Sequence, residues 1–220
     1  MRVELYVGPL AEFYREPLTV AARQEGEAAP TTAVIVEKIT EWIDWISEGL
    51  TRQGLLVRPL QWFEGDAEPC RHDLPLDAIL ALKLFLAHGG SASCPPQLPK
   101  EPSLDPAWIA MAESDFADTP YDQLLVPELW LPAAFDFTFP CPLPDGHELS
   151  AGSATALATQ CGLLRERLFA ATPLDAALWA RTEPRGREVR ALAQHAIGVL
   201  ETAAADSART GWPVLLHPAG

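Results

Sequence analysis

The alternation of apolar and polar residues predicts a strand at each end of the chain. Residues 2–8 place Val3, Leu5 and Val7 on one face and polar or aromatic side chains on the other. A two-residue period of this kind is typical of a half-buried strand. The apolar run within residues 212–217 predicts a last strand near the C-terminal end.

The clearest helix is predicted over residues 33–53. Apolar residues recur there with a spacing of about 3.6 residues, and acidic residues occupy the other side. Thr32 suits the N-cap and Gly54 the first position after the helix. Trp42 and Trp45 are both expected to pack in the core, because large aromatic side chains are usually buried.

The remaining pattern indicates a mixture of short strands and helices. Further helices are predicted at 17–24, 77–88, 105–116, 153–170 and 184–208, and further strands at 55–63, 123–131, 135–139 and 147–149. This order fits an α/β or α+β fold, in which a small mixed sheet is covered by helices. We expect one domain over residues 1–220, with the proline-rich loop at 89–102 as the only candidate boundary.

Charge changes the picture most in the middle of the chain, at residues 101–164. The net charge is −14, and residues 101–164 contain no lysine or arginine, while residues 101–150 contain ten acids. This balance argues against nucleic acids and anionic membranes, which bind through clusters of basic side chains. It favours a basic partner instead.

Five acids in this region are the candidate partner-binding residues: Glu113, Asp115, Asp118, Asp122 and Asp145. Carboxylates at this density also suit a hard cation, or a pair of carboxyls that act in glycoside hydrolysis. The spacing does not match an EF-hand loop, and a solvated acidic face explains the same residues.

Metal and cofactor chemistry have weaker support. Cys70, His72, His88 and Cys94 are zinc-type ligands within 25 residues, but their spacing departs from the short paired spacings of structural zinc sites. We therefore expect no metal and no cofactor. The motifs that bind phosphates or carry a nucleophilic serine are missing from the sequence.

Another candidate site is Cys141, which stands near His147 and two acids, Asp145 and Glu148. A catalytic thiolate needs an electropositive surrounding that lowers its pKa. No basic residue stands near Cys141 in the sequence, so catalysis by this group is disfavoured.

The sequence predicts a cytoplasmic protein. The first ten residues include Glu4 and have no apolar run typical of a signal peptide, and no segment approaches the ~20 apolar residues that span a bilayer. Four scattered cysteines are too few for a disulfide scaffold.

Four segments resemble a family of uncharacterised bacterial cytoplasmic proteins. They are LYVGPL at 5–10, LWLPAAFDFTF at 129–139, GSATAL at 152–157 and GWPVLL at 211–216. These motifs are structural in type and cover about half of the chain. Ala133-Ala134 departs from the polar or β-branched residue expected before the Phe-Asp-Phe run. No activity is associated with the family, so the resemblance implies no catalytic residue.

These observations together predict an interaction protein, of which an immunity-like protein is one form, that binds a basic partner through residues 101–150. The alternative is a small hydrolase that depends on carboxylates, with or without a divalent metal. The sequence leans away from an enzyme and leaves the oligomeric state open.

Overall fold

The computed structural model describes residues 1–24, 26–65, 67–90, 93–113 and 119–219. Its centre is an open sheet of six strands: β1 Arg2–Val7, β2 Cys70–Pro75, β3 Leu129–Leu131, β4 Phe139–Pro142, β5 Glu148–Ser153 and β6 Val214–Pro218. The strand order is β2-β1-β6-β3-β5-β4. Only β3 and β5 run parallel among these pairs. The predicted mixed sheet covered by helices is confirmed.

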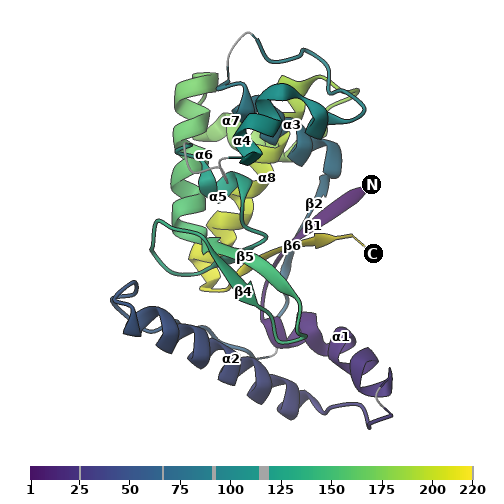
Figure 1. Ribbon diagram of the computed structural model, residues 1–220, viewed down its shortest axis with the longest axis vertical. Helices are drawn as coiled ribbons and strands as arrows, with labels where there is room; N and C mark the ends of the chain where they lie inside the picture. The colour runs from purple at the N-terminus through teal and green to yellow at the C-terminus, as the bar shows by residue number, and fades with distance from the viewer. Residues whose placement is uncertain (25, 66, 91–92, 114–118, 220) are drawn as a thin grey trace.

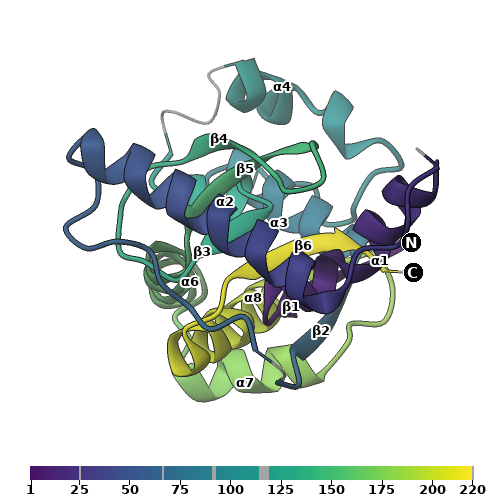
Figure 2. The ribbon, with the colours of Figure 1, turned by 90° about the horizontal axis from the view of Figure 1, so that it is seen from below.

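Helices cover both faces of this sheet (Figure 1). They are α1 Leu10–Gln24, α2 Thr32–Arg52, α3 Leu76–Ala87, the short 3₁₀ helix η1 Pro102–Leu104, α4 Pro106–Glu113, α5 Asp122–Leu125, α6 Ala154–Phe169, α7 Pro173–Arg181 and α8 Val189–Thr210. Helices α1 and α2 cover one face, and the later helices, packed around α8, cover the other. Seen from below, α2 lies across the strands (Figure 2).

The alternation of β1 explains why the sheet has two cores. Val3, Leu5 and Val7 contribute to the core on the α8 side, whereas Tyr6 contributes to the core beneath α1 and α2. Successive side chains of a strand point to opposite faces, so one strand supplies both layers. The strands predicted at the two ends of the chain, β1 and β6, pair with each other near the middle of the sheet.

Helix α2 forms as predicted, with its N-cap one residue earlier. The Thr31 side chain accepts a hydrogen bond from the Val34 N–H at 3.4 Å. At the other end Gly54 has φ +74°, and its N–H donates to Thr51 O at 2.9 Å while the Leu55 N–H donates to Leu50 O at 2.9 Å. This pair of bonds satisfies the last carbonyls of the helix.

The predicted strand at 55–63 is wrong. The segment is irregular and is held to α2, because the Leu60 N–H donates to Ser47 Oγ at 2.9 Å. The second neighbour of β1, beside β6, is the edge strand β2, which sequence analysis missed. Only Leu74 of its six residues is fully buried, since an edge strand needs few apolar side chains.

The predictions around residues 123–139 are correct in part. Residues 122–125 form the turn of helix α5, and β3 is only three residues long. Phe135 and Phe137 lie in a loop, and only Phe139 belongs to a strand. The three rings nevertheless cluster, with centroids 4.7 to 6.1 Å apart. Their apolar packing therefore does not require a regular strand.

Two predicted helices have different limits. Helix α1 begins at Leu10 and contains Pro17, whereas the proline suggested a start at residue 17. The predicted helix at 184–208 is observed as α8, which begins only at Val189, and it is preceded by α7, which sequence analysis missed. Gly186, in the connection between them, has φ +93°, a conformation that interrupts a right-handed helix.

The proline-rich loop at 89–102 is bonded to the start of α8. The Leu98 N–H donates to Arg187 O at 2.7 Å, and the Val189 N–H donates to Pro96 O at 3.1 Å. Leu98 itself is buried. Among the described residues, no helix has the length and apolar character that crossing a membrane requires.

Candidate functional site

The three predicted partner-binding acids that the structure describes belong to three different elements. Glu113 ends α4, Asp122 begins α5, and Asp145 lies in the turn between β4 and β5. In Figure 1 the β4–β5 hairpin lies below α4 and α5. Asp115 and Asp118 lie outside the described residues.

Asp122 belongs to a hydrogen-bond network that holds the fold. Gln160 Nε2 donates to its carboxylate at 2.6 Å, and Gln123 Nε2 donates at 3.2 Å. Gln123 is fully buried and also accepts a hydrogen bond from the Ser153 N–H at 2.8 Å. A carboxylate with these neighbours has a structural role.

Asp145 stabilises the β4–β5 turn. Its carboxylate accepts a hydrogen bond from the His147 N–H at 3.2 Å and pairs with His147 Nδ1 at 3.1 Å. Gly146 has φ +88°, as the predicted turn requires. The turn shares a hollow with Lys38 of α2.

The four zinc-type residues separate into two pairs. His72 Nε2 lies 2.9 Å from Asp206 Oδ2, and Arg209 donates to Cys70 Sγ at 3.5 Å. Burial alone raises the pKa of Asp206, but hydrogen bonds from Arg209 and His72 hold it below its ordinary value. In the part of the chain that the structure describes, no three His, Cys, Asp or Glu residues form a group suited to a metal ion.

The other pair includes an arrangement that sequence analysis missed. His88 Nε2 lies 3.1 Å from Asp105 Oδ1, and His88 Nδ1 lies 3.4 Å from Ser93 Oγ. The same Asp105 oxygen accepts the Ala107 N–H at 2.9 Å at the start of α4. Serine, histidine and aspartate do meet, but the carboxylate is a helix cap, and the serine contact is long for activation of a nucleophile. We assign this group a structural role next to Cys94.

Cys141 does not form a catalytic pair with His147. Its side chain is buried on β4, and burial, with a smaller contribution from Glu148, raises the pKa of the thiol to about 12. The His147 side chain is 81% exposed and pairs with Asp145. A thiol with this pKa is neutral at physiological pH and is a poor nucleophile.

Alkylation should therefore distinguish the cysteines. At pH 8, iodoacetamide is expected to label Cys70 first, because it is half-buried and Arg209 donates to its sulfur. Cys141 and Cys161 should stay unlabelled in the folded protein, since burial raises the pKa of both thiols. Peptide mass spectrometry measures the order, and labelling in guanidinium is the control. Fast labelling of Cys141 in the native protein contradicts the buried geometry.

The outer side of α2 is the most distinctive exposed surface. Four acids follow one another at helical spacing on its exposed side: Glu37, Glu41, Asp44 and Glu48. Trp45 lies beside this row with 58% of its surface exposed. We call these five residues the α2 face. Trp42 is buried as predicted, and its Nε1 donates to Pro142 O at 2.7 Å, but the prediction that Trp45 is a core residue is wrong.

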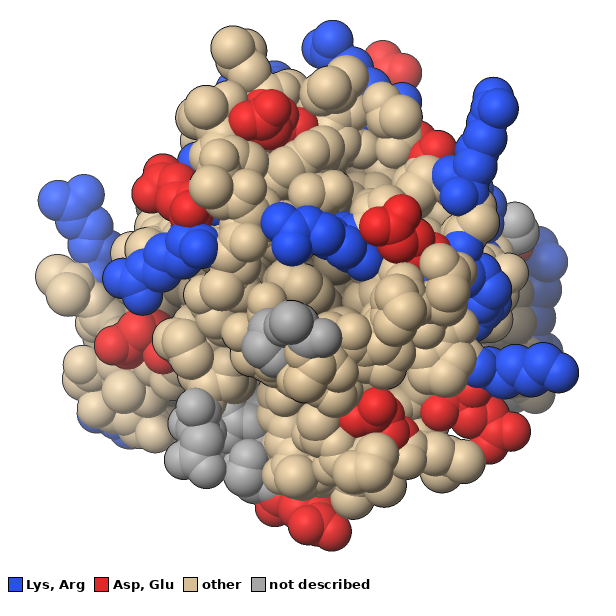
Figure 3. Space-filling view, turned by 90° about the horizontal axis from the view of Figure 1, so that it is seen from above, with Lys and Arg blue, Asp and Glu red and all other residues tan. Residues whose placement is uncertain are grey.

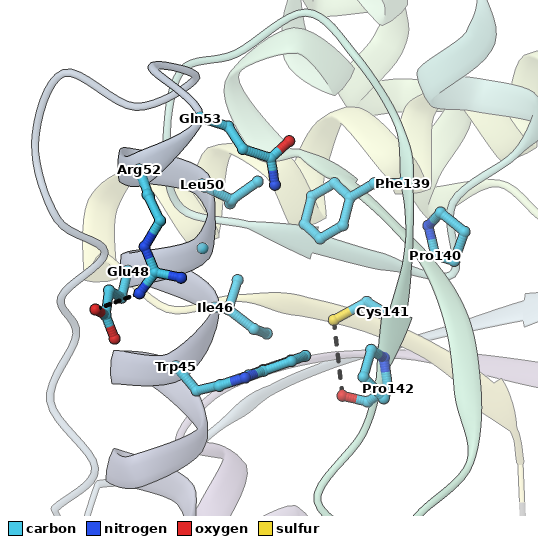
Figure 4. A pocket seen from close by; sticks show the side chains of 11 residues that line it. Trp45, Ile46, Glu48, Leu50, Arg52, Gln53, Phe139, Pro140, Cys141 and Pro142 are labelled. Carbon is cyan, nitrogen blue, oxygen red and sulfur yellow. Dashed lines mark hydrogen bonds and ion pairs between the residues drawn. The ribbon is translucent and has the colours of Figure 1, made fainter.

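An apolar cleft of about 350 Å³ lies between α2 and β4. Its lining includes Trp45, Ile46, Gly49 and Leu50 from the helix and residues 139–142 from the strand (Figure 4). We call it the α2–β4 cleft. Trp45 and Phe139 face it from opposite elements, and the Glu48–Arg52 ion pair at 2.5 Å stands at its outer side.

Gly49 lines this cleft at a position with open space around it. A Cβ built at Gly49 has no atom of another residue within 4 Å, apart from its own helix and neighbours. Glycine in a helix interior costs about 0.5–1 kcal/mol relative to alanine. The helix therefore carries a small cost at a cleft-lining position that has space for a side chain.

Strand β4 is an edge strand without free backbone donors on its outer side. Phe139 and Cys141 pair with β5, and the Leu143 N–H continues this ladder to His147 O at 2.7 Å. The alternate residues, Pro140 and Pro142, point their backbone away from β5. Because proline has no N–H, this edge does not support addition of another strand.

A second groove, of about 810 Å³, lies on the other side of α2 against residues 60–65. One of its two acids, Glu64, accepts hydrogen bonds from the Leu10 and Ala11 N–H groups at 3.1 and 2.7 Å, and from Trp62 Nε1 at 2.5 Å. Burial raises the pKa of Glu64 despite these bonds. Both carboxylate oxygens serve the start of α1, so the group is a helix cap.

Each of the two clefts has an exposed aromatic side chain in its lining. Trp45 lines the α2–β4 cleft and is 58% exposed, and Phe63 lines the second groove and is 72% exposed. The opposite end of the molecule presents lysine and arginine side chains interspersed with acids (Figure 3). Exposed apolar groups gathered within a short stretch of surface often mark a binding site.

The fold and this surface define an open-sheet α/β protein with one helix layer that carries an exposed, acidic and aromatic face. Comparison with protein-family models, curated proteins and solved structures gives no match. The resemblance of the four sequence segments to a bacterial family stays a prediction.

Proposed function

We propose that this protein is an interaction protein that binds a basic partner protein through the α2 face. The observation that carries the proposal is Trp45, a large aromatic side chain exposed beside an apolar cleft and next to a row of acids. Aromatic side chains at the centre of an interface contribute most of its binding energy. An immunity-like protein that neutralises a cationic protein is one concrete form.

Electrostatics supports a basic partner. The net charge of −14 attracts cationic molecules over long distances. The acids of the α2 face then lie where such a partner would make contact. Complementary charges of this kind raise the association rate and select against acidic competitors.

Residues 101–164, the base-free segment without lysine or arginine, also contribute to the proposed binding surface. Residues 139–142, which form one wall of the cleft, belong to it. Its dispersed acids contribute to the overall field. We further propose a cytoplasmic location, because all four cysteines are free thiols.

Among the described residues, no specific observation favours the alternative, a carboxylate-dependent or metal-dependent hydrolase. Asp122, Asp145 and Glu64 each stabilise a local structure through the hydrogen bonds described above. A general acid or base needs a proton that can move to a substrate.

Charge reversal on the α2 face tests the proposed function. The variant Glu37→Lys with Glu41→Lys is expected to weaken capture of basic proteins at low salt by at least tenfold, because two attractive charges become repulsive. The measurement is affinity capture from lysate at low and high salt, followed by titration of the purified captured protein. Wild-type binding should also weaken at high salt.

The matched control reverses two exposed acids of the base-free segment. Glu101→Lys with Glu113→Lys changes the net charge by the same amount, and both positions are exposed. Capture should fall only modestly in this control. The α2 face would be contradicted as the binding surface if both variants lost capture equally, or if the amount of captured protein were the same at low and high salt.

A further inference from the structure

We infer that the partner presents a basic amphipathic helix, which lies along α2 and places an apolar side chain in the α2–β4 cleft. This inference rests on the proposed function and adds the kind of element that binds. Three features restrict what can bind: the α2–β4 cleft, the acids of the α2 face and the backbone chemistry of the β4 edge.

The β4 edge disfavours an extended peptide. Strand addition needs backbone donors and acceptors along an open sheet edge. Pro140 and Pro142 remove the donors from the outward positions, and Trp42 Nε1 already donates to Pro142 O at 2.7 Å. A partner must therefore bind the cleft through side chains.

The acids of the α2 face have the spacing of a helix. Glu37 to Glu48 spans about 16 Å at 1.5 Å per residue, which is three turns. A second helix packed beside α2 at a small crossing angle presents its own residues with the same period. Lysine or arginine at three- and four-residue intervals then meets Glu37, Glu41 and Asp44, whereas Glu48 already pairs with Arg52 at 2.5 Å.

The cleft suits one apolar anchor. Its floor includes Ile46, Leu50 and Cys141, all of which are buried. Trp45 forms a wall, and its exposed ring can also stack against an arginine of the partner. The absence of a side chain at Gly49 leaves room for a leucine or an aromatic residue.

Two synthetic peptides test this inference on the full-length protein. Each has about 18 residues, or five helical turns, with the same leucine, glutamine, lysine and arginine content. One places leucines at i, i+3, i+4 and i+7, and the other alternates leucine with polar residues in a period of two. Calorimetric titration gives the affinities, and ¹H–¹⁵N spectra follow the indole N–H of Trp45, which is assigned with Trp45→Phe.

The helical peptide is expected to bind at least tenfold more tightly than the alternating peptide and to shift the Trp45 indole signal. Gly49→Leu, which fills the cleft, and Trp45→Ala should each reduce binding at least tenfold. Leu174→Ala is the control, because Leu174 is 83% exposed on α7, and its affinity should equal that of the wild type. Circular dichroism and denaturation confirm that each variant is folded.

The outcomes separate the two proposals. Equal affinity for both peptides, tighter binding of the alternating peptide, or binding that Gly49→Leu leaves unchanged would overturn the helix inference. The proposed function survives any of these results if the Glu37 and Glu41 reversal still weakens capture of basic proteins by at least tenfold. If the wild-type protein neither binds the peptides nor captures basic proteins in a salt-sensitive way, both proposals are wrong.

Discussion

Replacement of Gln123 by alanine is expected to lower the free energy of unfolding by about 3 to 5 kcal/mol. Gln123 is fully buried, and its side chain bonds to the Ser153 N–H, to Phe137 O at 3.1 Å and to Asp122. Alanine leaves two backbone groups without these partners and also leaves a cavity. Each unsatisfied buried group costs about 1–3 kcal/mol.

Chemical denaturation measures this change, and the melting temperature should fall by roughly 10 °C. Gln123→Glu should be worse than alanine at pH 7, because it loses both N–H donors and places a buried charge next to Asp122. Its deficit should shrink as pH falls, since burial favours the protonated carboxyl. Gln61→Ala, at an exposed position, is the control and should change stability little. A Gln123→Ala protein as stable as wild type would contradict the network.

Replacement of Gly198 by alanine is expected to destabilise the protein by about 3 kcal/mol, because the added methyl group has no space. A Cβ at this position would lie 2.5 Å from Ala180 N and 2.6 Å from Ala176 O. Both atoms belong to the backbone of α7, so relief requires the whole helix to move. The close approach of α7 and α8 depends on this glycine.

Gly49→Ala is the matched control for Gly198→Ala. Both glycines lie inside long helices, but a Cβ at Gly49 meets no atom of another element within 4 Å. Gly49→Ala should therefore stabilise the protein by about 0.5–1 kcal/mol, the difference in helix propensity. The two alanine variants should change the denaturation midpoint in opposite directions. A stable Gly198→Ala variant would show that α7 packs less closely than the structure describes.

The secondary structure of segments with a strong local pattern of apolar residues could be predicted from the sequence. The helix at 33–53 has a strong apolar period and a glycine after its end, so its limits differ from α2 by one residue. The two terminal strands carry clear alternation or a compact apolar run. The fold class followed from the order of these elements.

Segments decided by distant partners were not predictable. Strand β2 is mostly polar because it is an edge strand, and its pairing with β1 joins residues about 70 positions apart. The aromatic rings at Phe135 and Phe137 suggested a strand, but both residues lie in a loop, and Gln123 Nε2 donates a hydrogen bond to Phe137 O within it. A local pattern contains no information about such pairing.

The candidate site illustrates the same division. Sequence analysis identified the acidic balance and the base-free segment, and with them the preference for a basic partner. It did not separate Trp42 from Trp45, because both lie near the apolar face of one helix and differ only in what packs against them. The predicted acids Glu113, Asp122 and Asp145 all lie in the acidic stretch at 101–150, but they belong to different structural elements.

The sequence by itself determined the α2 helix, the terminal strands, the mixed α/β class and the excess of acids, because these depend on local periodicity and composition. Only the tertiary structure decided the strand order, the exposure of Trp45 and the cleft beside it. The physical reason is that β4, with its two outward prolines, reaches the edge of the sheet and packs along α2 through contacts between residues about 100 positions apart. Burial and exposure at that distance are set by packing and not by the residues next along the chain.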